Sequence, residues 1–147
     1  MNPSRSLPLA LCLCALATQP VPAAQPSTTA QALSSVAGLL GTWHCVDGKV
    51  KETDTYTRRS NAILDTDSRG GTTVITFDAK RQKWVVFAIG SGGYSTSEGT
   101  VRPNEPNEAT FLIVYPHASN KPYVVDGPFG NTEGAKMTIG SMSCVKT

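Results

Sequence analysis

The fold of this chain is decided by one stretch, Leu39-Leu40-Gly41-Thr42-Trp43-His44-Cys45. Trp43 is a large apolar side chain of the kind that fills a protein core. Cys45 has one later counterpart, Cys144, which stands three residues before the last residue of the sequence. A disulfide between the two cysteines would join the first strand predicted in this chain to the last one.

Short segments rich in β-branched and aromatic residues lie between these two cysteines, separated by turn clusters. The predicted strands cover residues 41–45, 50–59, 61–67, 72–77, 83–89, 94–102, 110–115, 123–125 and 136–145. Residues 103–107, which include two prolines, are predicted to form a loop. No long helical pattern interrupts the series, so a parallel βαβ fold is not expected.

These strands predict an all-β domain, namely an antiparallel up-and-down β-barrel of about eight to ten short strands. A β-sandwich is the alternative. Closure of a barrel places its first and last strands side by side, where a bond between Cys45 and Cys144 requires them to be. The two cysteines therefore favour the barrel.

The N-terminal residues have the features of a secretory signal peptide. Arg5 precedes an apolar run over residues 7–17, and small residues fit a cleavage site after Ala17 or after Ala23. The apolar run is about half of the roughly 20 residues that a membrane-spanning helix needs. We therefore predict a signal peptide over residues 1–23 and no integral membrane segment in the mature protein.

The remaining residues divide into a linker and one domain. Residues 24–33 are mostly small and polar, which predicts a flexible linker. Residues 34–147 are predicted to form the barrel, which begins with a single helical turn from Ser34 to Leu40.

Cysteine usage and charge indicate where the protein works and which partners are excluded. A signal peptide followed by two cysteines predicts a Cys45–Cys144 disulfide and a secreted or periplasmic location. Without Arg5 the basic and acidic side chains nearly balance. Such a chain has no field that would attract nucleic acid.

One family combines these features. Gly41-Thr42-Trp43, after a short helical turn, resembles the Gly-x-Trp motif that opens the first strand of lipocalins and other calycin barrels. The mature chain is also similar to small secreted bacterial lipocalin-like domains of unknown function. The matching pieces are the segment from Leu39 to Cys45, the hairpin from Phe77-Asp78 to Trp84, the strand Thr96-Ser97-Glu98-Gly99, and Cys144. The chain departs from the lipocalins in lacking the Thr-Asp-Tyr loop and the arginine that packs on the first-strand tryptophan.

A barrel of this size is filled by its own side chains or holds one small ligand. We expect a shallow pocket at the open end, lined by aromatic side chains and a few polar groups. The candidate ligand-binding residues are Trp43, Trp84, Tyr94, Tyr115, Tyr123 and His117. Packing in the core is the alternative for the two tryptophans, and a solvated loop position is the alternative for His117, which is otherwise a possible haem ligand.

The sequence has no evident metal or catalytic site, and no cofactor is expected. Two histidines, His44 and His117, are too few for a zinc site once both cysteines are bonded. Asp65 and Asp67 would share one face of a strand, which is typical of paired glycosidase carboxyls, but they also suit the turn that follows. No nucleophile motif is present.

Three functions are compatible with these observations. The first is a non-enzymatic secreted or periplasmic barrel that binds a small apolar ligand or a protein partner. The second is a secreted enzyme inhibitor, similar to barrel inhibitors of bacterial proteases, that inserts the segment before Ser34 into its target. The third is a weak hydrolase that uses Asp65 and Asp67.

Overall fold

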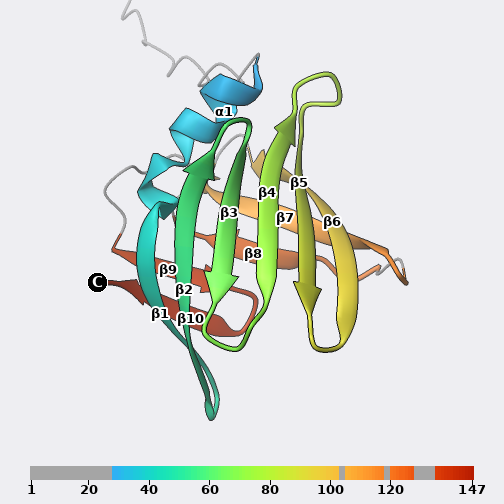
Figure 1. Ribbon diagram of the computed structural model, residues 1–147. Helices are drawn as coiled ribbons and strands as arrows, with labels where there is room; N and C mark the ends of the chain where they lie inside the picture. The colour runs from blue at the N-terminus through green and yellow to red at the C-terminus, as the bar shows by residue number, and fades with distance from the viewer. Residues whose placement is uncertain (1–27, 103–104, 118–119, 128–134) are drawn as a thin grey trace, which may run out of the picture.

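Ten antiparallel strands close into a barrel in the part of the chain that the structure describes (Figure 1). A computed structural model describes residues 28–102, 105–117, 120–127 and 135–147. The strands are β1 (Gly41–Asp47), β2 (Val50–Arg59), β3 (Ala62–Asp67), β4 (Thr72–Asp78), β5 (Lys83–Gly90), β6 (Gly93–Arg102), β7 (Glu105–Tyr115), β8 (Tyr123–Asp126), β9 (Lys136–Ile139) and β10 (Met142–Lys146). Each strand pairs with the next, and β10 pairs with β1. The predicted up-and-down barrel is confirmed.

The C-terminal segment and the loop before β7 differ from the prediction. Residues 136–145 form two strands because Gly140, at φ +59°, turns the chain between β9 and β10. The predicted loop over residues 103–107 is wrong from Glu105 onward, since β7 begins there. Pro106 is tolerated in this strand because β6 and β7 change register between Val101 and Arg102, where the regular pairing is interrupted.

A helix precedes the barrel where a flexible linker was predicted. Helix α1 (Thr29–Ser35) begins at Thr28, whose hydroxyl accepts a hydrogen bond from the backbone N–H of Gln31. The Gln31 side chain in turn accepts one from the backbone of Thr28, which completes a capping box. The linker prediction is therefore wrong for residues 28–33, while residues 24–27 lie outside the described residues.

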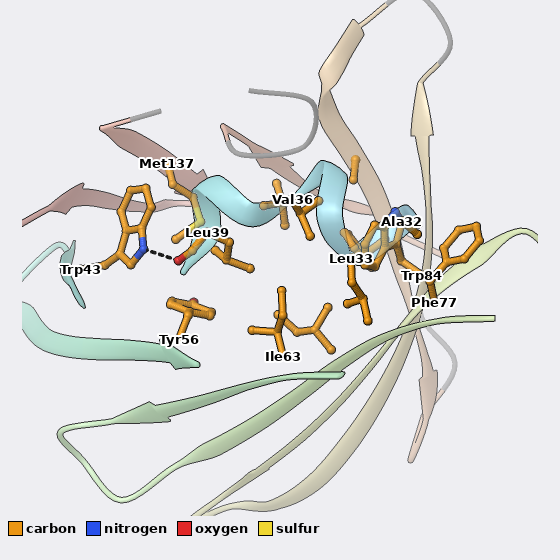
Figure 2. Close-up of a cluster of buried hydrophobic side chains, with 14 of the residues drawn as sticks. Ala32, Leu33, Val36, Leu39, Trp43, Tyr56, Ile63, Phe77, Trp84 and Met137 are labelled. Atoms are coloured by element: carbon orange, nitrogen blue, oxygen red, sulfur yellow. Dashed lines mark hydrogen bonds between the residues drawn. The ribbon is translucent and has the colours of Figure 1, made fainter. Parts of the chain in front are cut away.

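The helix lies at one end of the barrel (Figure 1). A short 3-10 helix, η1 (Ala37–Leu39), continues from α1, and the two elements bury Ala32, Leu33, Val36 and Leu39. These side chains point into the barrel toward Trp43, Tyr56, Ile63, Phe77, Trp84 and Met137 (Figure 2). We call α1 and η1 together the plug. The four apolar side chains of the plug are at most 3% exposed, and their burial stabilises its position in the barrel.

Thr29 and Trp43 make polar contacts that fix the plug to the strands. The Thr29 hydroxyl donates a hydrogen bond to the carbonyl oxygen of Phe77 at the end of β4, over 2.8 Å. The indole N–H of Trp43 donates to the carbonyl oxygen of Leu39, also over 2.8 Å (Figure 2). Because the indole is fully buried, this hydrogen bond also satisfies a donor that would otherwise be costly to bury.

Lys146 of β10 packs over the tryptophan of the first strand. Its ammonium lies 5.6 Å from the centre of the Trp43 ring and donates to the carbonyl oxygen of Gly38 over 2.8 Å. Gly41 leaves room for this side chain, since a Cβ there would lie 3.1 Å from its Cε. A lysine can make both contacts as a point charge, without the planar fork of an arginine.

The barrel closes between β1 and β10. Cys45 stands opposite Cys144 in the register of these two strands, and the two residues form a disulfide with their Cα atoms 4.0 Å apart. The predicted cysteine pair is confirmed. The bond spans 99 residues of the sequence, so it connects the two ends of the barrel domain covalently.

We predict that Lys146→Met lowers the free energy of unfolding by about 1–3 kcal/mol. The substitution removes a charge-assisted hydrogen bond and a cation–π contact while keeping an apolar side chain of similar length. Urea unfolding followed by tryptophan fluorescence, without reductant, measures the effect. The matched control is Lys136→Met, at an exposed position of β9. Equal losses for the two variants would contradict the role of Lys146.

Candidate functional site

A cavity of about 420 Å³ lies inside the barrel. Leu39 of the plug borders it on one side, and the turn between β9 and β10, at Gly140 and Ser141, borders it on the other. On β4 the cavity is lined by Thr73 and Ile75, which lie farther from the plug contact at Phe77. The plug therefore fills one half of the barrel, and the cavity occupies the half away from α1.

Most of the cavity wall is apolar. Strands β4, β5 and β7 to β10 contribute it, through Ile75, Val86, Val125, Met137, Ile139 and Met142. Two aromatic rings, Phe111 of β7 and Tyr123 of β8, are stacked with their centres 5.5 Å apart. This part of the wall is suited to the apolar body of a small molecule.

The strand Thr96-Ser97-Glu98-Gly99 shapes the aromatic part of this wall. A Cβ on Gly99 would lie 2.4 Å from Cδ1 of Phe111, so only glycine leaves space for the ring. Ser97 is buried, and its side chain hydrogen-bonds the hydroxyl of Tyr123. Two positions of the motif therefore hold the two rings in place.

The remaining wall is acidic. Glu52 and Asp54 of β2 and Asp65 and Asp67 of β3 all line the cavity. The alternation of side chains along a strand directs each pair to the same face, and the two strands are paired so that Asp54 lies opposite Asp67. The prediction that Asp65 and Asp67 share a face is confirmed by this register.

The two outer carboxylates have partners near the turn between β3 and β4. Glu52 lies 3.6 Å from the guanidinium of Arg69. One oxygen of Asp67 accepts hydrogen bonds from the backbone N–H groups of Arg69 and Gly71, over 2.7 and 3.0 Å. Asp67 thus forms the turn, as the sequence suggested, while its side chain also borders the cavity.

The two inner carboxyls differ in their surroundings. Asp54 is 4% exposed and Asp65 is 7% exposed, and one oxygen of each has no hydrogen-bond partner among the described residues. Burial, followed by the charges of Glu52 and Asp67, raises the pKa of Asp54 to about 6. Burial, followed by the charge of Asp54, raises the pKa of Asp65 to about 7, although a hydrogen bond from the Thr55 backbone acts in the opposite direction.

The other oxygen of Asp54 contacts the disulfide. Its Oδ2 lies 3.2 Å from Sγ of Cys45. A disulfide sulfur carries no proton, so a hydrogen bond here requires the carboxyl to donate. The raised pKa of about 6 makes the protonated form of Asp54, which this hydrogen bond needs, available in mildly acidic solution.

Next to these carboxyls lies Tyr56, whose ring is buried between the plug and the cavity. Burial, and then the charge of Asp65, raise its pKa well above the ordinary value for a phenol. The hydroxyl is therefore neutral at physiological pH. It is a hydrogen-bonding group of the site and carries no charge.

The structure brings one of the six predicted ligand-binding residues to the cavity. Tyr123 lines it. Trp43 and Trp84 pack in the core, at 0% and 2% exposure, in accordance with the alternative named for them. The two indoles pack against the apolar side chains of the plug in one buried cluster, which accounts for their burial.

The other three predicted residues lie on the outside. Tyr94 and Tyr115 stack with ring centres 4.8 Å apart on the outer face, beside Phe87. His117 is exposed after β7. Strand alternation places Tyr94 outside, because the odd-numbered residues of β6, such as Ser97 and Gly99, point inward. Tyr115 lies outside because β6 and β7 change register between Thr96 and Ser97, so that Tyr115 pairs with the outward Thr96. No contact of these residues with the cavity is present, and their ligand-binding role stays a prediction.

Sequence analysis missed Glu52 and Asp54. The signal that was present is the alternation Glu52-x-Asp54-x-Tyr56 in a predicted strand. An acidic face on a strand normally indicates the solvent side. The opposite face of this strand carries mostly polar residues as well. No difference in polarity between the two faces therefore indicated which of them points into the barrel.

One group of side chains in the described ranges has the spacing of metal ligands, namely Cys45, Asp54 and Cys144. Its two sulfurs are joined in the disulfide and are not thiolates. No other trio of potential metal ligands lies this close together among the described residues, so the cavity carboxylates do not converge on one point.

Comparison with known proteins identifies no relative. No family model, curated protein or solved structure matches this chain. Within the described residues, no helix is long and apolar enough to cross a membrane.

We predict that Asp65→Asn raises the free energy of unfolding at pH 8 by on the order of 2 kcal/mol and has a much smaller effect at pH 4. In the wild type the folded carboxyl holds its proton up to about pH 7, whereas the unfolded one loses it near pH 3.8. Wild-type stability therefore falls as the pH rises between these values, and the amide removes this loss.

Urea unfolding at both pH values measures the difference between the variant and the wild type. Asp47→Asn, at an exposed position of β1, is the control and should change neither value appreciably. A variant destabilised equally at pH 4 and pH 8 would contradict the assignment of a buried, raised-pKa carboxyl to Asp65.

Proposed function

We propose that this chain is a binding protein that holds one small molecule inside its barrel. The cavity carries this proposal, because about 420 Å³ lies within the range of roughly 300–1,000 Å³ that is typical of small-molecule sites. The lining supports it further. A mainly apolar wall with a few convergent polar groups is the usual composition of such sites.

The closed end of the barrel is consistent with a binding role. The plug fills that end with tightly packed side chains, whereas the lining reaches the turn between β9 and β10 at the other end. A ligand would enter there, between the turns. The fold and the Gly41-Thr42-Trp43 motif with Lys146 on its ring support the assignment of the chain to the calycin-like barrels.

The two alternatives receive less support. An inhibitor that inserts the segment before Ser34 would need that segment to be free, but Ala32 and Leu33 are buried in the barrel of their own chain. A hydrolase would use Asp65 and Asp67, yet one oxygen of Asp67 is occupied by the turn at Arg69 and Gly71. We therefore assign the carboxyls to binding.

We also propose that the protein is secreted or periplasmic. The disulfide supports an oxidising compartment, and the residues before the linker have the pattern of a signal peptide.

We predict that Ala88→Trp weakens binding of the neutral probe N-phenyl-1-naphthylamine by at least about tenfold, equivalent to roughly 1.4 kcal/mol. Ala88 lines the cavity, so the added indole occupies the space of the ligand. The matched control is Ile89→Trp on the outer face, where the side chain is 51% exposed. Probe fluorescence measures the affinity, and near-ultraviolet circular dichroism confirms that both variants fold.

Thr73→Phe fills the same space from β4 and serves as a second blocking variant. If the probe binds to both blocking variants as tightly as to the wild type, it binds outside the cavity. That result, or the absence of any binding, would contradict the proposed function.

We predict that the full chain, expressed in a bacterium, is recovered from the periplasm with its N-terminus at residue 18 or 24. Intact mass spectrometry determines the start, and reduction should add about 2 Da, one hydrogen for each sulfur of the disulfide. A full-length cytoplasmic protein with two free thiols would contradict the proposed location.

A further inference from the structure

We propose that the cavity selects an organic cation, specifically a primary ammonium group on an apolar or aromatic body, and that the ammonium lies between Asp54 and Asp65. This inference rests on the proposed function and specifies the chemistry of its ligand. It follows from the distribution of charge, hydrogen-bonding capacity and apolar surface inside the barrel.

Charge in the cavity is strongly one-sided. The acidic wall comes from two neighbouring strands, through Glu52 and Asp54 on β2 and Asp65 and Asp67 on β3. No lysine, arginine or histidine is among the described residues that line the cavity. Among the described residues, Arg69 is the cation that contacts this group: it pairs with Glu52 from the turn between β3 and β4, and its side chain is 60% exposed. The cavity therefore attracts positive charge and repels anions.

The inner carboxyls are the part of the acidic wall that is not satisfied by the protein. Oδ1 of Asp54 and Oδ1 of Asp65 have no hydrogen-bond partner in the described chain, and both side chains are more than nine-tenths buried. Leaving a buried acceptor without a donor is unfavourable, and more so when the acceptor is charged. A ligand that brings donors to these oxygens removes this cost.

A primary ammonium fits both carboxyls better than other donors. It carries three N–H donors and no acceptor, so it can hydrogen-bond two carboxylates at once and offset their charges. A hydroxyl offers one donor and no charge. The apolar wall opposite, with the stacked rings of Phe111 and Tyr123, accommodates the body to which the ammonium is attached.

A bare metal ion fits the same residues less well. Calcium takes six to eight oxygen ligands at short distances. The ligand atoms of the cavity carboxylates do not gather in groups of three within the described residues. The apolar wall would contribute nothing to an ion, whereas it would contact most of the surface of an organic cation.

The pH dependence of binding follows from the same two carboxyls. Ionisation of Asp54 near pH 6 and of Asp65 near pH 7 strengthens attraction to an ammonium, which itself stays charged over this range. Affinity for the cation therefore rises from pH 5 to pH 8. The other titratable or charged groups at this site are Glu52, Tyr56, Asp67, Tyr123 and, at the turn, Arg69.

Three probes with one body and different charge test this inference. They are tryptamine, which is a cation, tryptophol, which is neutral, and indole-3-propionate, which is an anion. Isothermal titration calorimetry with the mature, disulfide-bonded protein measures their affinities at pH 5 and pH 8. We expect tryptamine to bind at least about tenfold more tightly than tryptophol at pH 8 and indole-3-propionate to bind most weakly. We expect the preference for tryptamine to shrink at pH 5.

The Asp54→Asn/Asp65→Asn variant should lose this preference and its pH dependence while keeping the affinity for tryptophol. A control with the same change in net charge is Asp47→Asn/Asp126→Asn, at exposed positions, and it should behave like the wild type. If the double cavity variant does not fold, Asp65→Asn alone should reduce the preference.

Three results would overturn the inference. The first is tryptophol binding as tightly as tryptamine, and the second is that none of the three probes binds. The third is a preference for tryptamine that survives in the cavity variants. If N-phenyl-1-naphthylamine still binds to the wild type and binds more weakly to the Ala88→Trp variant, the proposed binding function stands and only the selection for a cation is wrong. If that probe also fails to bind, the binding function itself is wrong.

Discussion

The contacts of the Trp43 indole are the interactions on which the rest of this structure depends. Its indole N–H donates to the carbonyl oxygen of Leu39, and Lys146 lies over its ring while donating to the carbonyl oxygen of Gly38. The plug, the first strand and the last strand therefore meet at one fully buried side chain. Because the plug is held at this end, the apolar side chains of α1 and η1 fill only one half of the barrel, and the interior of the other half remains open.

The two halves of the interior are built from different residues. Large apolar side chains such as Ile63, Phe77 and Trp84 fill the barrel around the plug. Around the cavity the inward positions include the small residues Thr73 and Ala88, together with carboxyls. A protein optimised for stability alone would fill this space, since cavities and buried carboxyls both lower the free energy of unfolding. Their presence together is the physical argument for a ligand.

The disulfide connects the closure of the barrel to this site. Cys45 and Cys144 join β1 to β10 beside Asp54, whose carboxyl contacts the sulfur of Cys45. A cross-link that spans 99 residues restricts the unfolded chain and so offsets part of what the buried carboxyls cost. The stability that the disulfide adds between β1 and β10 therefore helps the barrel to tolerate buried carboxyls in its interior.

Much of the fold could be predicted from local patterns. β-Branched segments, turn residues and two distant cysteines were sufficient for an all-β barrel closed by Cys45 and Cys144, because strand propensity and turn chemistry are local properties. The helix at residues 29–35 was missed because its buried stripe is short and follows a polar segment. Most of the residues that line the cavity could not be predicted from the sequence. An acidic strand face such as that of Glu52 and Asp54 normally points to solvent, and only closure of the barrel placed these two carboxyls inside, beside Asp65. What the sequence determined by itself is the order of the strands and the bond that joins them. Which face of β2 is inside, and therefore which charges meet there, was decided by the tertiary structure, because inside and outside exist for a strand only after the barrel has closed.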